Sequence, residues 1–166
     1  MKVIIAIDDS PYSKQVVGTL IKRHWPAHMS FKILTVLEPL PTSGYDFDDS
    51  AAFAETLQEI DKHRHEAAEH FCQEVRHRIE AEIPNALAHY EIREGLPRTE
   101  IINSAVDWMA DAIMLGAHGK DVCPHNLLGS VSRAIVNHAP CSVEIIRPRE
   151  SHKWHPTDKH TAASTT

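Results

Sequence analysis

Short apolar runs alternate with amphipathic stretches along the chain. The first run, residues 3–7, is rich in β-branched side chains and ends at two aspartates, as expected for a parallel strand buried on both faces. Ser10 and Pro11 follow as an N-cap and first-turn pair, which predicts a helix that continues to about residue 21. Four later apolar runs predict strands at 31–37, 88–93, 112–115 and 143–146.

The longest amphipathic stretch extends from about residue 50 to the vicinity of Pro84, which ends it. Its apolar residues recur at spacings of three, four and seven, which predicts a long helix with one apolar face. Shorter helices are predicted after Gly95 and Pro97, and from about Gly129 to about His138. The apolar face of the long helix comprises Phe53, Leu57, Ile60, Ala67, Phe71, Val75 and Ile79.

This order of strands and helices predicts a single-domain α/β fold, namely an open, parallel, five-stranded sheet with helices on both faces. A chain of 166 residues can bury a core of its own without disulfides or metals. We assign residues 1–148 to the domain. We expect residues 149–166 to form a disordered C-terminal tail, because they lack periodic apolar positions. Ligands of such sheets bind at the carboxyl ends of the strands.

The composition narrows the classes of partner. The chain has 23 acidic and 17 basic residues, so we expect neither a nucleic-acid nor a membrane partner, because both favour strongly basic surfaces. Its three cysteines form no CxxC pair, which argues against a disulfide framework and a zinc knuckle. The opening residues leave no room for a signal-peptide core, and no apolar run approaches the roughly 18 residues of a membrane span. We therefore expect a cytoplasmic protein.

The segment after the fourth predicted strand carries the candidate chemistry. Gly116 and Gly119 allow close backbone approach and positive φ angles. Gly129 and Ser130 begin a helix, whose free amide groups and dipole favour a phosphate group. Ser132 adds a second hydroxyl donor beside that of Ser130. Taken singly, such glycines are usually turn residues and such a serine is usually an ordinary helix cap. Only the complete pattern of glycines and serines therefore indicates a phosphate site.

The complete pattern, G-x2-G-x9-G-S, resembles the signature of ATP-binding members of the universal stress protein family. The similarity covers residues 1–148 and includes an aspartate after the first strand and the runs LLGSVS and HAPCSVEIIR. The resemblance implies a Rossmann-like fold of the adenine nucleotide alpha hydrolase-like group that binds ATP, with or without Mg²⁺. On this resemblance Asp8 approaches the ribose and the backbone of Val36 contacts adenine. Leu115 and Gly116 would line the adenosine pocket, and the phosphate side would comprise His118, Gly119, Gly129, Ser130, Val131 and Ser132.

Several of these residues keep a second interpretation. Asp8 has a capping role near the first helix as its alternative, and His118 either stabilises a phosphate or only occupies the loop. Cys123 is either a redox-sensitive thiol or an inert one. Pro124 and Ser142 depart from the family pattern: the first could alter the reach of the loop, and the second replaces a proline before the last strand.

Two histidine patterns resemble metal sites only at first sight. His65, Glu66 and His70 are one residue too long for the zinc motif HExxH. His63, His70 and His77 are seven residues apart, so neighbouring members are about 10 Å apart along a helix and cannot share an ion. The sequence therefore predicts no metal site.

The resemblance implies a regulatory or stress-response module that binds ATP and is recognised by a client protein. It also implies a homodimer, formed through the last strand from Val143 to Ile146. The chain lacks the Walker motif GxxxxGK[ST], so we assign no catalytic residue and expect at most slow ATP hydrolysis. One alternative is a dimeric interaction protein of the same fold that binds no nucleotide. Another is an adenylating or pyrophosphatase-type enzyme, although residues 6–11 read AIDDSP rather than SGGxDS.

Overall fold

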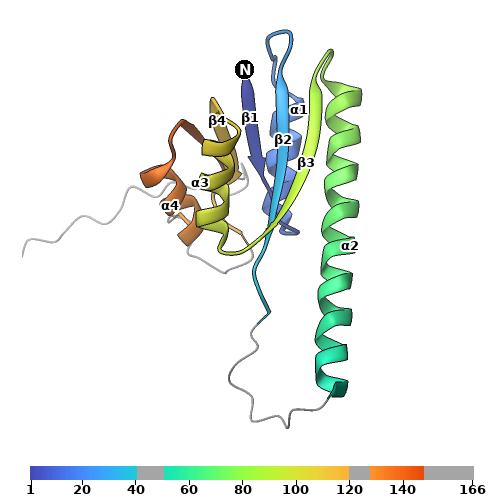
Figure 1. Cartoon of the computed structure of the whole chain (residues 1–166). Coiled ribbons are helices and arrows are strands. Elements are labelled where there is room, and N and C mark those ends of the chain that lie inside the picture. The colour runs from blue at the N-terminus through green and yellow to red at the C-terminus, as the bar shows by residue number, and fades with distance from the viewer. Residues whose placement is uncertain (41–50, 120–127, 148–166) are drawn as a thin grey trace, which may run out of the picture.

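The computed structural model describes residues 1–40, 51–119 and 128–147. The predicted tail from residue 149 onwards, Cys123 and Pro124 lie outside these ranges. Figure 1 shows a central sheet flanked by helices. Each predicted strand and helix is present, with bounds that differ from the prediction by about one or two residues. In chain order the elements are β1 (Lys2–Ala6), α1 (Pro11–Ile21), β2 (Ser30–Leu37), α2 (Ala51–Glu82), β3 (Leu87–Glu94), α3 (Pro97–Asp107), β4 (Ala112–Gly116), α4 (Ser130–His138) and β5 (Ser142–Ile146).

The sheet is parallel throughout, as predicted, and its strands lie in the order β3-β2-β1-β4-β5. β1 is central, and Ile5 pairs with Ile33 of β2 on one side and with Met114 of β4 on the other. Strands β2 and β3 extend the sheet in one direction, whereas β4 and β5 extend it in the other. The order therefore reverses between β1 and β4, which is where open parallel sheets bind their ligands.

Two layers of helices bury the two faces of the sheet. Successive side chains of a strand point to opposite faces. Val3 and Ile5 accordingly contribute to the core beneath α1 and α2, whereas Ile4 and Ala6 contribute to the core beneath α3 and α4. All four side chains are buried. A strand covered on both faces must be apolar at every position, which explains why the run at 3–7 shows no alternation.

Helix α2 is longer than the strands beside it. Val75 and Ile79, in its C-terminal half, are buried against the sheet as the apolar spacing predicted. The prediction is wrong for Ile60, whose side chain is 43% exposed, and for Ala67, which is exposed too. Ile60 belongs to the N-terminal part of α2, which extends past the end of the sheet (Figure 1). None of the helices in the described residues combines the length and apolar character of a membrane span.

Candidate functional site

The candidate site lies where the carboxyl ends of β1 and β4 meet the first turn of α4. The chain leaves β1 at Asp8 and leaves β4 through residues 116–119, then returns at Gly129. The Gly129 amide donates a hydrogen bond to the carbonyl oxygen of Ala117 over 2.9 Å. This bond places the N-terminus of α4 beside the carboxyl end of β4, so the two glycine-containing parts of the motif are neighbours in space.

Asp8 closes the turn between β1 and α1. Its Oδ1 atom accepts hydrogen bonds from the Ser10 amide (3.1 Å), the Ser10 hydroxyl and the Ser13 hydroxyl (2.7 Å), and the Asp8 amide donates to Ser13 Oγ (2.8 Å). These bonds form a local turn before α1, whose N-cap is Ser10, and no side-chain capping bond is made at that residue. The other carboxylate oxygen, Oδ2, points toward the second loop, because a Cβ atom on Gly119 would lie 3.0 Å from it. One oxygen thus holds the turn while the other faces the candidate site.

Glycine is needed in this loop because of close approach rather than unusual backbone angles. A Cβ atom on Gly116 would lie 3.0 Å from the His118 carbonyl oxygen and 3.3 Å from Tyr12 Cβ. Glycine at 116 and 119 allows positive φ angles, but neither residue adopts one, and within the described ranges Gly95 is the glycine that does. A side chain at Gly116 would press on the backbone carbonyl of His118, and one at Gly119 would press on the Asp8 carboxylate, so either neighbour would have to shift.

The N-terminus of α4 offers amide donors. Gly129 is the N-cap, and the amides of Ser130, Val131 and Ser132 have no acceptor within the helix. These groups also carry the positive end of the helix dipole. Ser130 is exposed, whereas Ser132 is buried and donates its hydroxyl to the Gly116 carbonyl oxygen over 2.8 Å. The Ser132 hydroxyl therefore joins α4 to β4 and is not the free donor that the sequence suggested.

His118 and Tyr12 form one wall beside the loop. His118 is buried, and its ring centroid lies 5.4 Å from that of Tyr12 at an interplanar angle of 54°. Tyr12 comes from the first turn of α1, directly after Pro11. The sequence interpretation did not include Tyr12, because a tyrosine in a first helical turn carries no local signal of a site. Its contact with residue 118 is made only by the fold.

Val36 and Leu115 have their side chains at the core and their main chain toward the carboxyl side of the sheet. The Leu115 side chain is buried in the core beneath α3 and α4, and Val36 packs against the same core. The pairing of β2 with β1 ends at Leu34, whereas β2 continues to Leu37. The main chain at Val36 therefore lies past the last paired residue of β1, beside the carboxyl end where Asp8 is found.

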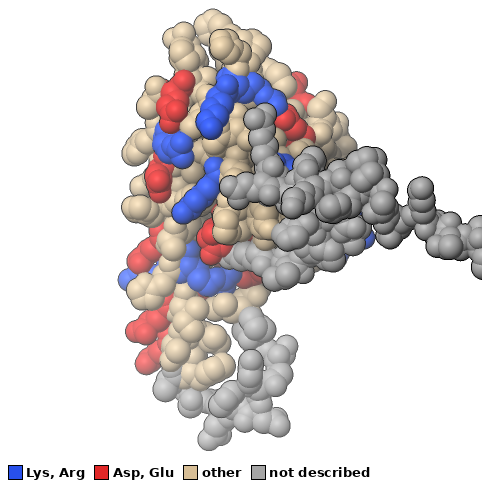
Figure 2. All heavy atoms as spheres, turned by 180° about the vertical axis from the view of Figure 1, so that it is seen from behind, with Lys and Arg blue, Asp and Glu red and all other residues tan. Residues whose placement is uncertain are grey.

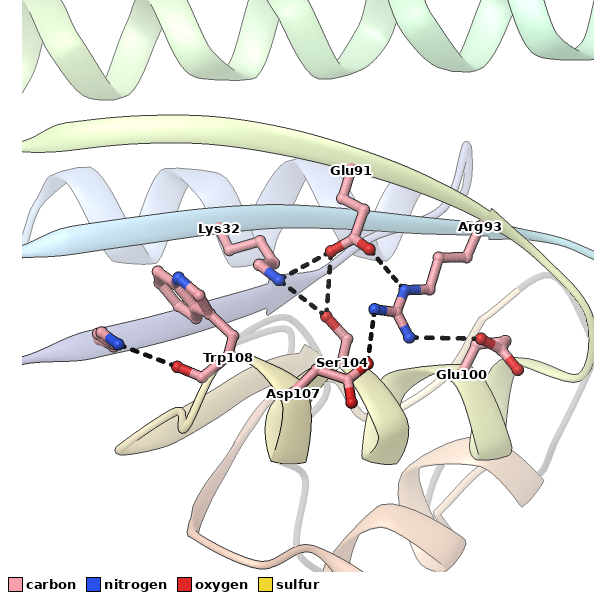
Figure 3. A network of polar contacts seen from close by, with 8 residues as sticks. Lys32, Glu91, Arg93, Glu100, Ser104, Asp107 and Trp108 are labelled. Atoms are coloured by element: carbon pink, nitrogen blue, oxygen red, sulfur yellow. Dashed lines mark hydrogen bonds and ion pairs between the residues drawn. The ribbon is translucent and has the colours of Figure 1, made fainter.

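A polar network that the sequence interpretation missed attaches α3 to β2 and β3 (Figure 3). The buried Lys32 ammonium donates to Glu91 Oε2 (2.8 Å) and Ser104 Oγ (3.3 Å), and it lies 5.1 Å from the centre of the Trp108 ring. Burial favours the protonated form of Glu91, but hydrogen bonds from Lys32 and Arg93 outweigh it and lower the pKa of this carboxyl. The network stabilises the helix layer without reaching the candidate site.

Arg93 completes this network at the carboxyl side of β3. Its guanidinium donates to Glu91 Oε1 (2.6 Å), to Asp107 Oδ2 (3.0 Å) and, at 3.5 Å, to Glu100 Oε2. Figure 2 shows the molecule from behind relative to Figure 1, and acidic and basic side chains are interspersed over the described part of this surface. Opposite charges are thus neighbours both within this network and on that surface.

Sequence comparison identifies relatives over most of the chain. The sequence model of the Universal stress protein family matches residues 1–147. A universal stress protein of Methanothermobacter thermautotrophicus is 39% identical over 66 residues, which are 40% of this chain and 44% of that protein. A universal stress protein of Synechocystis is 23% identical over 154 residues, which cover 88% of this chain and 97% of the relative.

Solved structures of universal stress proteins share the fold. UspA from Lactobacillus plantarum aligns with a TM-score of 0.71 at 22% identity and covers 89% of this chain and 97% of its own. A universal stress protein in complex with cAMP aligns with a TM-score of 0.54 at 16% identity, covering 89% and 96%. A member from Arabidopsis thaliana with AMP bound aligns with a TM-score of 0.56 at 17% identity, covering 90% and 93%. Since the family match extends over residues 1–147, the chain belongs to the universal stress protein family.

Proposed function

We propose that the protein binds an adenine nucleotide at the carboxyl ends of β1 and β4, with ATP as the expected ligand. The observation that supports this most directly is the position of the α4 N-terminus. The bond from Gly129 to Ala117 holds its amide donors beside the glycine turn at 116–119. Helix N-termini of this kind favour phosphate groups. Two structural neighbours are described with cAMP and with AMP, so an adenosine carrying phosphate suits this fold.

In this proposal the nucleotide extends from β2 toward α4. Asp8 Oδ2 accepts a hydrogen bond from a ribose hydroxyl, since Oδ1 is already occupied by Ser10 and Ser13. The backbone at Val36 contacts adenine, and Leu115 and Gly116 line the adenosine side. The phosphates lie against the amides at the start of α4 and beside the wall that His118 forms. The residues on this phosphate side are His118, Gly119, Gly129, Ser130, Val131 and Ser132. A Mg²⁺ ion could accompany the phosphates of ATP.

We propose a regulatory or stress-response role in the cytoplasm for the protein, rather than catalysis. ATP binding would favour one conformation or assembly, which a client protein then recognises. We assign no catalytic residue and expect at most slow hydrolysis. The titratable groups described at the site already have structural contacts, Asp8 with two serines and His118 with the ring of Tyr12.

We further propose that β5 forms a homodimer. Within the described residues β5 pairs with β4 alone, so its second edge is available to another strand. Val143 and Ile145 pack against the core beneath α3 and α4, which fixes the strand in place. A second copy could pair with this edge about a two-fold axis. Light scattering at tens of micromolar protein should give the mass of a dimer, and a monomer mass under those conditions would contradict this assignment.

The nucleotide assignment is tested by calorimetric titration of the purified chain with ATP, ADP, AMP and cAMP. Gly119→Ala should lower the affinity more than about tenfold, because its Cβ would lie 3.0 Å from Asp8 Oδ2 and displace that oxygen. Gly18→Ala is the matched control, because a Cβ there has no atom within 4 Å. Mass spectrometry of small molecules released from the denatured protein should also detect an adenine nucleotide. Absence of binding to all four nucleotides would favour an interaction protein of the same fold.

A further inference from the structure

We propose that Asp61, His65 and Glu94 bind one divalent transition-metal ion, with Zn²⁺ as the best match. Each residue offers one ligand atom, and the three atoms lie within 4.8 Å of one another. Asp61 and His65 belong to α2, and Glu94 ends β3. The cluster is therefore at the carboxyl end of β3, two strands away from β1 in the sheet order. It is separate from the proposed nucleotide site, and neither proposal depends on the other.

The geometry of the three side chains suits a shared ion. Asp61 and His65 are four residues apart on α2, so they project from the same side of the helix. His65 Nε2 lies 3.2 Å from Glu94 Oε1, and His65 Nδ1 lies 3.6 Å from Asp61 Oδ2. Ligand atoms about 2.1 Å from a tetrahedral zinc ion are roughly 3.4 Å from one another. One ion can bind only one of the two ring nitrogens, so with Nε2 as the ligand the Asp61 carboxylate must turn from the Nδ1 side of the ring toward Nε2, starting from ligand atoms that lie within 4.8 Å of one another.

The orientation of the His65 ring supports this assignment. Its Nδ1 atom lies 3.2 Å from the backbone carbonyl oxygen of Asp61, within hydrogen-bonding distance. A proton on Nδ1 donated to that carbonyl leaves the lone pair of Nε2 facing Glu94. Histidines that bind metals commonly donate their other ring N–H to a carbonyl or carboxylate in this way, which fixes the tautomer.

The elements that carry the ligands are held together by other contacts. The Arg64 guanidinium donates to the Glu38 carbonyl oxygen over 2.7 Å and joins α2 to the chain just after β2. The Gly95 amide donates to the Leu37 carbonyl oxygen over 3.0 Å, directly after Glu94. One turn further along α2, the Tyr90 hydroxyl donates to Glu69 Oε1 over 2.9 Å. These contacts position both sides of the cluster without the metal.

The donor set and charge favour a transition metal over Mg²⁺ or Ca²⁺. One imidazole nitrogen and two carboxylates suit Zn²⁺, whereas Mg²⁺ and Ca²⁺ prefer oxygen ligands alone. The two carboxylates of Asp61 and Glu94 supply two negative charges. Arg64, 3.5 Å from Asp61 Oδ1, offsets part of this charge. The ligand side chains are between 36% and 66% exposed, so an ion can enter from solvent and water can complete its coordination.

The test is a calorimetric titration of the full, chelator-treated chain with ZnCl₂, without nucleotide. We expect one equivalent to bind, and Asp61→Asn, His65→Gln and Glu94→Gln should each lower the affinity more than about tenfold, since even supporting residues cost this much at metal sites. His70→Gln is the matched control, because His70 is an exposed histidine of the same helix. Co²⁺ provides a second readout through its visible absorption, which should lack a thiolate charge-transfer band if imidazole and carboxylate are the ligands.

A thermal measurement separates metal binding from a simple ion-pair cluster. Zn²⁺ should raise the midpoint of unfolding of the wild type and of His70→Gln, but not of the three ligand variants. Glu94→Gln should fold normally, because glutamine has the same shape as the exposed glutamate that it replaces. Circular dichroism of the variant will verify this. If wild-type protein binds no Zn²⁺, or if none of the three substitutions weakens binding, the site is not a metal site. The proposal would also be overturned if each ligand variant differed from the wild type in its unfolding midpoint by the same amount with and without Zn²⁺. The three residues would then form only an ion-pair cluster.

Discussion

The Gly129 amide and the Ala117 carbonyl oxygen are hydrogen-bonded over 2.9 Å, so the first turn of α4 is tied to the residue that follows β4. The position of the helix amides is thus set by the backbone itself. A Cβ atom on Gly129 would lie 3.4 Å from this same oxygen and 3.6 Å from His118 Cα. A side chain at 129 would therefore meet the backbone of the loop.

Gly129→Val should therefore weaken both ATP binding and the fold near α4. Its two methyl groups would press against the backbone at 117–118 and move the helix away from β4. We expect a loss of more than about tenfold in ATP affinity and a lower midpoint of thermal unfolding, whereas Gly129→Ala should stay close to the wild type in both, because its Cβ atom would make only ordinary van der Waals contacts. Calorimetry and thermal unfolding measure the two effects. Unchanged ATP affinity in Gly129→Val would contradict the assigned site.

Ser130→Ala and Ser132→Ala should separate binding from stability. The buried Ser132 hydroxyl donates to the Gly116 carbonyl, so its loss should lower the free energy of unfolding by about 1–3 kcal/mol. Ser130 is exposed at the first position of α4, so Ser130→Ala should mainly lower ATP affinity, by about tenfold to a hundredfold. Denaturant unfolding and calorimetry of both variants give the comparison. If the two substitutions lowered the free energy of unfolding equally, the assignment of Ser132 to stability and of Ser130 to binding would be contradicted.

Glu91→Gln should destabilise the protein more than Lys32→Met. The Lys32 side chain is 8% exposed, whereas that of Glu91 is 30% exposed and retains Arg93 as a partner. Removal of the carboxylate leaves a buried cation without its anion, at a cost of about 3 kcal/mol or more, whereas removal of the lysine leaves Glu91 paired. Denaturant unfolding of both variants measures this order. The exposed Arg23 and Glu144 pair is the control, and Arg23→Gln should cost under about 1 kcal/mol.

The stability of the protein should fall in acid through the same carboxyl. The pKa of folded Glu91 lies below its usual value, whereas the unfolded chain should titrate near about 4.3. The unfolded state therefore binds the proton more readily, so the contribution of Glu91 is present above that value and is lost as the pH falls through the folded pKa. Unfolding curves of wild type and Glu91→Gln between pH 7 and about pH 3 should converge on acidification. A constant difference across this range would contradict the expectation.

The sequence predicted the elements because each depends on neighbouring residues. The β-branched run at 3–7 and the pair of Ser10 and Pro11 identify a strand and a helix by local pattern alone. The glycine spacing at 116, 119 and 129 likewise identified the loop that the structure brings together. The extent of the apolar face of α2 was wrong at Ile60, because burial there depends on where the sheet ends, which no local pattern encodes.

The contacts that the sequence could not predict join residues that are far apart in the chain. Lys32 is a charged residue in a mainly apolar strand. Its partners Glu91 and Ser104 are 59 and 72 residues away in the sequence. Tyr12 meets His118 only because α1 and the loop after β4 converge at one end of the sheet. Side-chain pairs of this kind follow from strand order, and the sequence alone predicted that the sheet is parallel but not which strands are neighbours.

The central position of β1 has a consequence for the order of folding. β1 pairs on one edge with β2, the next strand in the chain. The other edge of β1 pairs with β4, which begins only at Ala112. The Lys2 amide likewise bonds to Asp111, across 109 residues of sequence. Such distant contacts slow folding, because a long loop must close before they form. A nascent chain that ends after β3 would expose one edge of β1 and the apolar side chains of Ile4 and Ala6. We therefore expect ribosome-bound fragments of that length to need protection from aggregation until β4 has been synthesised.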